Sequence, residues 1–454
     1  MVDLLLRGAT VLSAGREPVT TDIAIEHGLI VDTDADPGVR ARQTIDAAGL
    51  HAMPGVIDTH VHFNEPGRSD WEGVATGSAA AAAGGVTLFA DMPLNSDPPL
   101  LDAATFGAKH ARCRRLSLTD FALWAGLTPE SLPHMRQLAG LGAIGFKAFM
   151  CNSGIPEFRA ADDATLYQGM QTAAELDLPV AVHAENDSIT AYLGELIRME
   201  RTVTDARDFL ESRPVVAEVE AAGRAITLAE ATGCRLHIVH VSCGRVVDLV
   251  SAARARGVDV SCETCAHYLH FCDDDVARLG PVAKCAPPIR DLRQREELWR
   301  AVDAGEIDFV ASDHSPAPAE LKLHPDFFSA WGGIAGVQST LSVMLTGAKA
   351  RGIGTGVLVR CLSTAPGDRY RLPRKGRIEA GYDADIVLVE PESRDVLSVE
   401  QLLSRHRLSP YLGEAFVGKL RRTILRGRTI YLNGAICSEP TGRLVRPASQ
   451  GDEV

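Results

Sequence analysis

Between residues 54 and 372, short apolar segments alternate with Ala-rich segments, and this alternation restricts the possible folds more than any other feature of the chain. Ala-rich segments such as 73–85 and 218–233 have the composition of helices. Repeated strand and helix pairs indicate a parallel α/β sheet, and eight such strands favour a (β/α)8 TIM-like barrel. The eight predicted strands begin near residues 56, 85, 119, 144, 179, 235, 258 and 307.

The two ends of the chain have a different pattern. Residues 1–53 and residues 373–454 contain short segments in which apolar and polar side chains alternate between turns rich in Gly and Asp. This pattern is typical of strands that are buried on one face only. We therefore expect both ends to fold together as one small, discontinuous β-sandwich domain, with the barrel domain formed by residues 54–372.

Charge and composition argue against several classes of partner. The 454 residues carry a formal net charge of -13 and contain no cluster of Lys and Arg of the kind that binds nucleic acid or anionic membranes. The chain shows neither a basic leader before an apolar segment nor a run of about 18 apolar residues. We predict a cytoplasmic enzyme that acts on a small molecule, with no nucleic-acid or membrane partner. The ten cysteines form no repeated CxxC pair, so we expect most of them to be reduced.

Two histidines lie in the first predicted strand of the barrel, VIDTHVHF. Because side chains alternate along a strand, His60 and His62 point to the same face. Imidazole nitrogens are common ligands of zinc and related metals, so the pair is a candidate half of a metal site. A pair of hydrogen-bonded core histidines is the alternative interpretation.

Lys147 interrupts the otherwise apolar strand segment IGFKAFM. Lysine is rarely buried without a partner, so a buried ion pair or a side chain that reaches the surface is one interpretation. The other is chemical. Burial lowers the pKa of a lysine, and a neutral amine can add carbon dioxide to form a carbamate whose two oxygens can bridge two metal ions.

Three further polar residues end predicted strands. His183 closes PVAVH, and Asp313 closes IDFVASD. In RLHIVHVS, His237 and His240 point to opposite faces, and we choose His240 because it lies nearer the C-terminal end of the strand. Active sites of such barrels lie at the C-terminal ends of the strands, so these residues, with His60, His62 and Lys147, predict a binuclear metal site.

The same residues carry a resemblance to the amidohydrolase superfamily, in particular to the cyclic amidohydrolases, which include dihydroorotase, hydantoinase and allantoinase. The resemblance covers nearly the whole chain. It implies that His60, His62, Lys147, His183, His240 and Asp313 hold two divalent ions, usually zinc, with Lys147 carbamylated by carbon dioxide. It also implies a homo-oligomer, either a dimer or a tetramer. The matching segments are GVIDTHVHFNEPG at 55, GGVTLFADMP at 84, GFKAFM at 145, VHAEN at 182, HIVHVS at 237, CETCAHYL at 262, KCAPPIR at 284, ASDHSP at 311 and GYDADIVLVE at 381.

Within this group the chain is most similar to the allantoinases. Asn64 stands where dihydroorotases typically carry an arginine that binds the substrate carboxylate, and allantoin has no carboxylate. The resemblance implies hydrolysis of (S)-allantoin to allantoate, in purine breakdown, by a bridging hydroxide with Asp313 as proton shuttle. The alternatives are a dihydroorotase, a hydantoinase or dihydropyrimidinase, and a non-catalytic dihydropyrimidinase-like structural protein. We expect substrate contacts from Asn64, Ser153, Ser315, Gly333 and Ala335.

Overall fold

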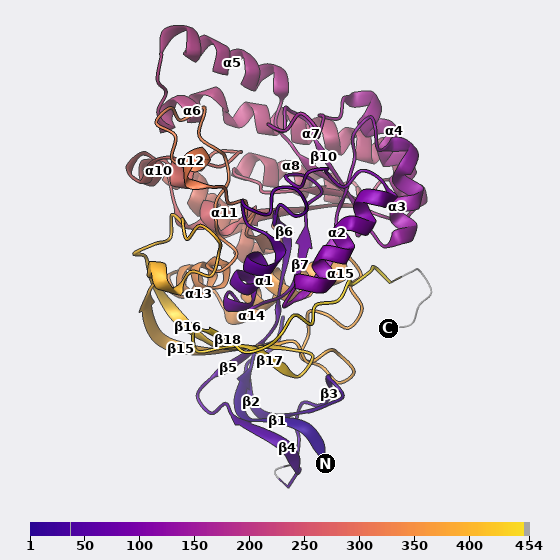
Figure 1. Ribbon diagram of the computed structural model, residues 1–454, viewed down its shortest axis with the longest axis vertical. Coiled ribbons are helices and arrows are strands. Elements are labelled where there is room, and N and C mark those ends of the chain that lie inside the picture. Colours follow the sequence, from indigo (N-terminus) through magenta and orange to yellow (C-terminus); the bar gives the residue numbers. More distant parts are fainter. Residues whose placement is uncertain (37, 449–454) are drawn as a thin grey trace.

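The computed structural model describes residues 1–36 and 38–448, and it consists of a barrel beside a smaller β-rich part (Figure 1). In the figure the barrel and its helices fill the upper part, while the first and last strands of the chain lie together below. The (β/α)8 barrel and the joint folding of the two chain ends, both expected from the sequence, are confirmed.

The barrel is assembled from two arcs of parallel strands. One arc has the order β14-β13-β12-β11-β10-β9, and the other has the order β6-β7-β8. The third predicted strand is broken at Trp124, which separates β8 from β9, and a bridge between Val61 and His314 joins the two arcs on the other side. The strands are β6 (Val56–Val61), β7 (Val86–Asp91), β8 (Asp120–Leu123), β9 (Ala125–Gly126), β10 (Phe146–Phe149), β11 (Val180–His183), β12 (Leu236–Ile238), β13 (Val260–Cys265) and β14 (Phe309–Ala311).

Helices cover the outside of the barrel. The predicted Ala-rich helices are present as α1 and α7, and α7 ends at Gly233, whose left-handed backbone favours glycine. The helices are α1 (Val74–Ala83), α2 (Ala103–Leu116), α3 (Met135–Leu141), α4 (Asp163–Glu175), α5 (Asp187–Glu200), α6 (Ala206–Ser212), α7 (Val215–Thr232), α8 (Gly244–Ala255), α9 (Ala266–His270), α10 (Asp273–Leu279), α11 (Leu292–Ala304), α12 (Ala319–Lys322), α13 (Thr340–Arg351), α14 (Thr355–Val359) and α15 (Ala365–Arg369).

The smaller part is a sheet built from both ends of the chain. Its strands have the order β18-β17-β16-β15-β5-β1-β2-β3, and β4 pairs with β1. Apolar residues from both ends, such as Leu6 and Ile386, share one buried cluster. The strands are β1 (Val2–Val11), β2 (Val19–Glu26), β3 (Leu29–Asp32), β4 (Ala41–Asp46), β5 (His51–Pro54), β15 (Ile386–Val396), β16 (Ala415–Leu425), β17 (Arg428–Leu432) and β18 (Ala435–Ile436).

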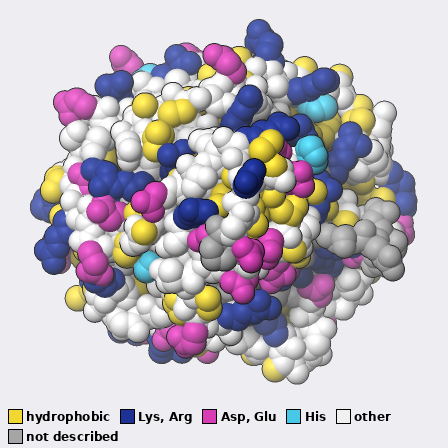
Figure 2. Space-filling view, turned by 90° about the horizontal axis from the view of Figure 1, so that it is seen from below, with side chains coloured by type: hydrophobic (Ala, Val, Ile, Leu, Met, Phe, Trp, Pro, Cys, Tyr) yellow, Lys and Arg dark blue, Asp and Glu magenta, His cyan; other side chains and the backbone are white. Residues whose placement is uncertain are grey.

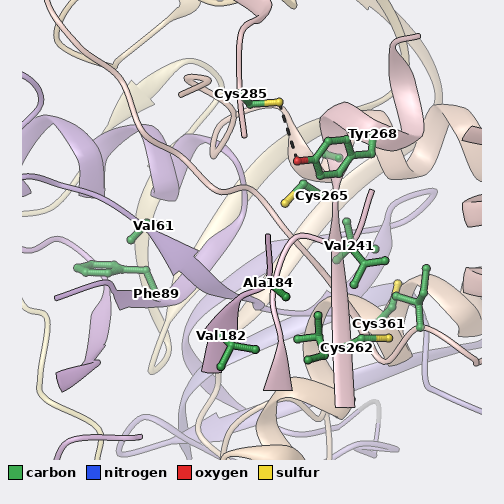
Figure 3. Packing of buried hydrophobic residues seen from close by; sticks show 14 of the residues in the cluster. Val61, Phe89, Val182, Ala184, Val241, Cys262, Cys265, Tyr268, Cys285 and Cys361 are labelled. Atoms are coloured by element: carbon green, nitrogen blue, oxygen red, sulfur yellow. Dashed lines mark hydrogen bonds between the residues drawn. The ribbon is translucent and has the colours of Figure 1, made fainter. Parts of the chain in front are cut away.

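The packing of the barrel strands decides which side chains face its interior. Val180 and Val182 of β11 belong to the large apolar cluster that the strands form with the helices. Figure 3 shows Val182, Ala184 and Cys262 among the residues of this cluster. Because side chains alternate along β11, His183 points the other way, into the barrel. The same rule turns Lys147 of β10 inward, since its neighbour Phe146 packs in the apolar cluster.

Charged side chains of both signs are spread over the face of the molecule seen from below (Figure 2). Figure 2 shows basic and acidic side chains interspersed over the lower face, without a continuous basic area. No helix within residues 1–36 and 38–448 has both the length and the apolar character that crossing a membrane requires.

Candidate metal centre

Three of the six predicted ligands meet at the C-terminal end of β6. The Nε2 atoms of His60 and His62 lie 3.2 and 3.4 Å from one oxygen, Oδ1 of Asp313. All three residues are buried. Two imidazole nitrogens and a carboxylate oxygen, gathered this closely, form a ligand set suited to zinc and related divalent ions.

The other three predicted ligands lie next to this group. The ring centroid of His240 is 4.6 Å from that of His183 and 5.5 Å from that of His60. His183 stacks on Phe149 with the ring centroids 4.4 Å apart, and Nζ of Lys147 lies 5.0 Å from the same phenyl centroid. The structure therefore brings all six residues into one cluster at the mouth of the barrel.

Two members of the cluster lie beyond the strands to which the sequence assigned them. β12 ends at Ile238 and β14 at Ala311, so His240 and Asp313 each follow the last strand residue by two positions. Both have left-handed backbones, with φ of 40° and 45°. Such a conformation costs a non-glycine residue about 1–3 kcal/mol, and it recurs at functional sites.

The neighbouring histidines have structural contacts. Nδ1 of His237 pairs with Oγ of Ser261 at 2.8 Å, and its Nε2 lies 3.2 Å from Oε2 of Glu263. Nδ1 of His314 accepts hydrogen bonds from the N–H groups of Gly336 and Val337, so His314 supports the mouth without joining the cluster.

Two buried glutamates that the sequence reasoning missed orient the histidines. Glu263 on β13 accepts a hydrogen bond at 2.7 Å from Nδ1 of His60, which leaves Nε2 available to a metal ion. Glu185 lies 2.7 Å from Nε2 of His183, which leaves Nδ1 available. Burial opposes ionisation of Glu185, but the guanidinium of Arg213 lowers the pKa of this carboxyl to about 2. Carboxylates in this outer position fix the orientation of histidine ligands.

A signal for these glutamates was present in the sequence. Glu263 is the one acidic residue inside the apolar strand VSCETC, and Glu185 follows His183 by two positions. A carboxylate in such a place needs a buried partner.

The protonation states of the cluster suit metal binding. Burial lowers the pKa of Lys147 to about 8, and it also lowers the pKa values of His62, His183 and His240. Burial alone would raise the pKa of Asp313, but the two nearby imidazoles lower it. These shifts favour neutral rings at His62, His183 and His240 and an ionised Asp313, which are the forms that bind metals.

Nζ of Lys147 is a buried atom without a hydrogen-bond partner among the described residues. A carbamate on this nitrogen would supply two anionic oxygens, a ligand type that divalent ions accept. The residues present therefore fit a pair of divalent ions together with a carbamylated lysine.

A cavity of about 500 Å³ opens over the cluster. Of the five predicted substrate contacts, Ser153, Ser315 and Gly333 line it. Gly333 passes so close to its neighbour that a β-carbon there would lie 2.2 Å from the carbonyl oxygen of Ser315, so only glycine fits.

The remaining two predicted contacts differ from the expectation. Asn64 is fully buried behind the cavity, where its Nδ2 donates to the carbonyl of Pro316, and Ala335 does not line the cavity either. Asn95, which the sequence reasoning missed, does line it and donates to Oγ of Ser315 at 3.2 Å. Its place in the loop directly after the second barrel strand was the available signal.

A second cluster of buried carboxylates lies where the barrel meets the smaller part. Asp120, Asp383 and Asp385 surround Nζ of Lys375 at 2.7–2.8 Å, and Arg426 also contacts Asp120. The ammonium group already balances these carboxylates, so this cluster is an internal ion network rather than a metal site.

The barrel and the polar cluster at its mouth define a hydrolase-like architecture, and comparisons with known proteins identify the family. A sequence profile of the amidohydrolase family matches residues 51–430. The chain is 51% identical to an allantoinase of Rubrobacter xylanophilus over 99% of both chains, and 51% identical to one of Solibacter usitatus over 98% of this chain and 97% of that protein. The structure of L-hydantoinase from Arthrobacter aurescens superposes with a TM-score of 0.95 at 32% identity, covering 98% of this chain and 100% of the other. This chain belongs to the amidohydrolase family.

Proposed function

We propose that this protein is a metal-dependent cyclic amidohydrolase that opens the ring of (S)-allantoin to give allantoate, a reaction of purine breakdown. It would use two zinc ions and a Lys147 carbamate made from carbon dioxide. The ions would be held by His60, His62, Lys147, His183, His240 and Asp313.

Metal ions at this place would lower the pKa of a water molecule and polarise the amide carbonyl that the water attacks. The protein's own groups handle the protons. Asp313 is ionised and lies beside both His60 and His62, so it can accept the proton of the attacking water. It then passes this proton to the ring nitrogen, which leaves as a neutral amine rather than as an anion.

A single observation carries the proposal: full-length identity of 51% to proteins named allantoinase coincides with a cavity lined by His60, His62, His183, His240 and Asp313. Hydrolysis of a hydantoin is the second candidate, since the whole fold superposes on an L-hydantoinase. The two substrates share a five-membered ring, so the cavity rather than the metals must distinguish them.

The test is a substrate panel on enzyme loaded with zinc and bicarbonate. We expect kcat/KM for allantoin to exceed the values for hydantoin and dihydroorotate by about 100-fold or more. A preference for hydantoin or dihydroorotate would reassign the substrate. Failure to hydrolyse any of the three with two ions bound would favour the non-catalytic alternative.

We further propose that the protein acts in the cytoplasm as a dimer or a tetramer. All ten cysteines are free thiols, and eight of them are buried, as is common for proteins of a reducing compartment. Light scattering on the purified protein measures the oligomeric state directly.

A further inference from the structure

Two buried lysines above the cavity lack the partners that a buried charge requires. Lys284 and Lys322 are only 5% and 3% exposed, and neither forms an ion pair within the described part of the chain. A buried ammonium without a carboxylate is costly, so such residues are rare. Burial lowers the pKa of each to about 7, so that near neutral pH both can persist as amines that still donate hydrogen bonds.

Both lysines donate hydrogen bonds to backbone carbonyls of one short segment, residues 328–333, which we call the roof segment. Nζ of Lys284 donates to the carbonyls of Phe328 and Ala330 at 3.1 and 2.5 Å. Nζ of Lys322 donates to the carbonyl of Trp331 at 3.0 Å, and also to the carbonyl of Lys284 at 3.0 Å. The two side chains therefore form one connected clamp on the roof segment.

The roof segment forms a wall of the cavity, because each of its six residues lines it. It contains no helix or strand, so no regular hydrogen-bond ladder fixes its position. A backbone bond from the N–H of Gly333 to the carbonyl of Lys284, 2.8 Å long, adds to the clamp. The position of this wall consequently depends on the lysines and their loops.

Lys284 also contacts the opposite wall. Its Nζ lies 4.6 Å from the ring centroid of Phe209 on α6, and both residues line the cavity. Two residues before the roof segment, Oδ1 of Asp326 accepts a hydrogen bond from the N–H of Thr204, in the loop between α5 and α6. The clamp thus fixes the roof segment relative to α6 as well as to the barrel.

We propose that Lys284 and Lys322 are positioning residues that hold the roof segment at a set distance above the metal cluster and thereby determine the affinity for a small, flat cyclic amide. The inference rests on the proposed function. Such a ring carries alternating N–H and C=O groups in its plane. The peptide groups of Gly332 and Gly333, which line the cavity, can form hydrogen bonds with these groups only if the roof segment lies at a fixed distance from the ring. If this wall is displaced by about 1 Å, the rate at which the bound substrate reacts can fall by about 10²-fold.

The experiment compares three lysine-to-methionine variants that keep the length of the side chain. Lys284→Met and Lys322→Met remove the clamp, and Lys349→Met is the control, because Lys349 is an exposed residue that pairs with Glu392. For each we would measure kcat and KM on allantoin, bound metal, and amide hydrogen exchange of residues 326–334. We expect KM to rise about tenfold in both clamp variants with metal content unchanged, and exchange in the roof segment to become faster.

Two results would overturn the proposal. Faster exchange without a change in KM would mean that the lysines only stabilise the loop. Loss of bound metal in step with activity would mean that they act on the metal cluster. Exchange needs no substrate, and the kinetic comparison can be run on whichever ring the wild-type enzyme prefers, so a wrong substrate assignment is recognised separately. If Lys284→Met does not fold, the KM and the hydrogen exchange of Lys322→Met test the proposal on their own.

Discussion

Two fully buried lysines of this protein stand in opposite surroundings. Nζ of Lys147 has no hydrogen-bond partner among the described residues, and burial lowers its pKa to about 8. Nζ of Lys375 is held by three carboxylates, which outweigh burial and raise its pKa. The same side chain is therefore a reactive amine at the mouth of the barrel and a fixed cation at the junction with the smaller part.

The difference shows what a buried lysine needs in order to do chemistry. Only a neutral amine adds carbon dioxide, and only an environment poor in anions keeps the amine neutral. At Lys147 the carboxylates of Asp313 and Glu263 favour an ammonium, but burial outweighs them, whereas three carboxylates in direct contact with Nζ outweigh burial at Lys375.

Removal of Lys147 should have the largest effect. Lys147→Ala eliminates the group that would bridge the metals, so we expect both bound ions and activity to be lost, with kcat/KM reduced by about 10³-fold or more. Short-chain carboxylates such as acetate or propionate should restore part of the activity, since they imitate the carbamate. Metal analysis by mass spectrometry and initial rates check both points. A variant that binds two ions tightly without added carboxylate would show that Lys147 bridges nothing.

Removal of Lys375 should damage stability instead. Lys375→Met removes the cation that the three carboxylates share. Arg426 still contacts Asp120 and Arg374 still contacts Asp383, but Asp385 loses its ion pair, so we expect the free energy of unfolding to fall by about 3–5 kcal/mol. Urea denaturation measures this loss, and kcat of the folded fraction should stay close to wild type. Adding Asp385→Asn to the variant removes one uncompensated charge and should recover part of the stability. A variant as stable as wild type would mean that water reaches the cluster.

Glu263→Gln should have a smaller effect on the metal site. The glutamine keeps the size of the side chain but removes the negative charge that faces Nδ1 of His60, so we expect metal affinity to fall by about 10–100-fold. Competition with a chelator gives the affinity, and Glu392→Gln on the surface is the control. Unchanged affinity would contradict the role assigned to this carboxylate.

The fold was predictable because its main signal is local. Each barrel strand is a short apolar run, and the run is visible without knowledge of its neighbours. The break at Trp124 was not visible, since the third strand reads as one apolar segment and is divided only by pairing with two different neighbours. The six cluster residues were found because each interrupts an apolar run at the end where barrel sites lie.

The missed residues depend on partners far along the chain. Glu263 meets His60 across 203 positions, and Lys284 meets Ala330 across 46. No local pattern shows such pairs. His240 and Asp313 were chosen because they lie at the C-terminal ends of predicted strands, but both follow the strands with left-handed backbones, so the loops set their direction. Asn64 carried the substrate argument, yet it is buried and does not line the cavity, whereas Asn95 does.

The smallest effect, a pH dependence, is the sharpest test of the contrast between the two lysines. The folded-state pKa of Lys147, about 8, lies below its ordinary value of 10.5. This group therefore contributes its full stability above pH 10.5, and the contribution is lost as the pH falls through 8. Recovery of metal-free enzyme with zinc at constant dissolved carbon dioxide should accelerate about tenfold per pH unit up to pH 8 and then level off.

Protonation of His62, His183 and His240 does not imitate a change near pH 8, because burial lowers their pKa values from an ordinary value of 6.5. The measurement is the rate at which activity returns after bicarbonate and zinc are added to decarbamylated enzyme, between pH 6 and 10. A rate that keeps rising to pH 10 would mean that Lys147 titrates like an ordinary ammonium. The surroundings of Lys147 would then resemble those of Lys375, and the physical basis for its carbamylation would be gone.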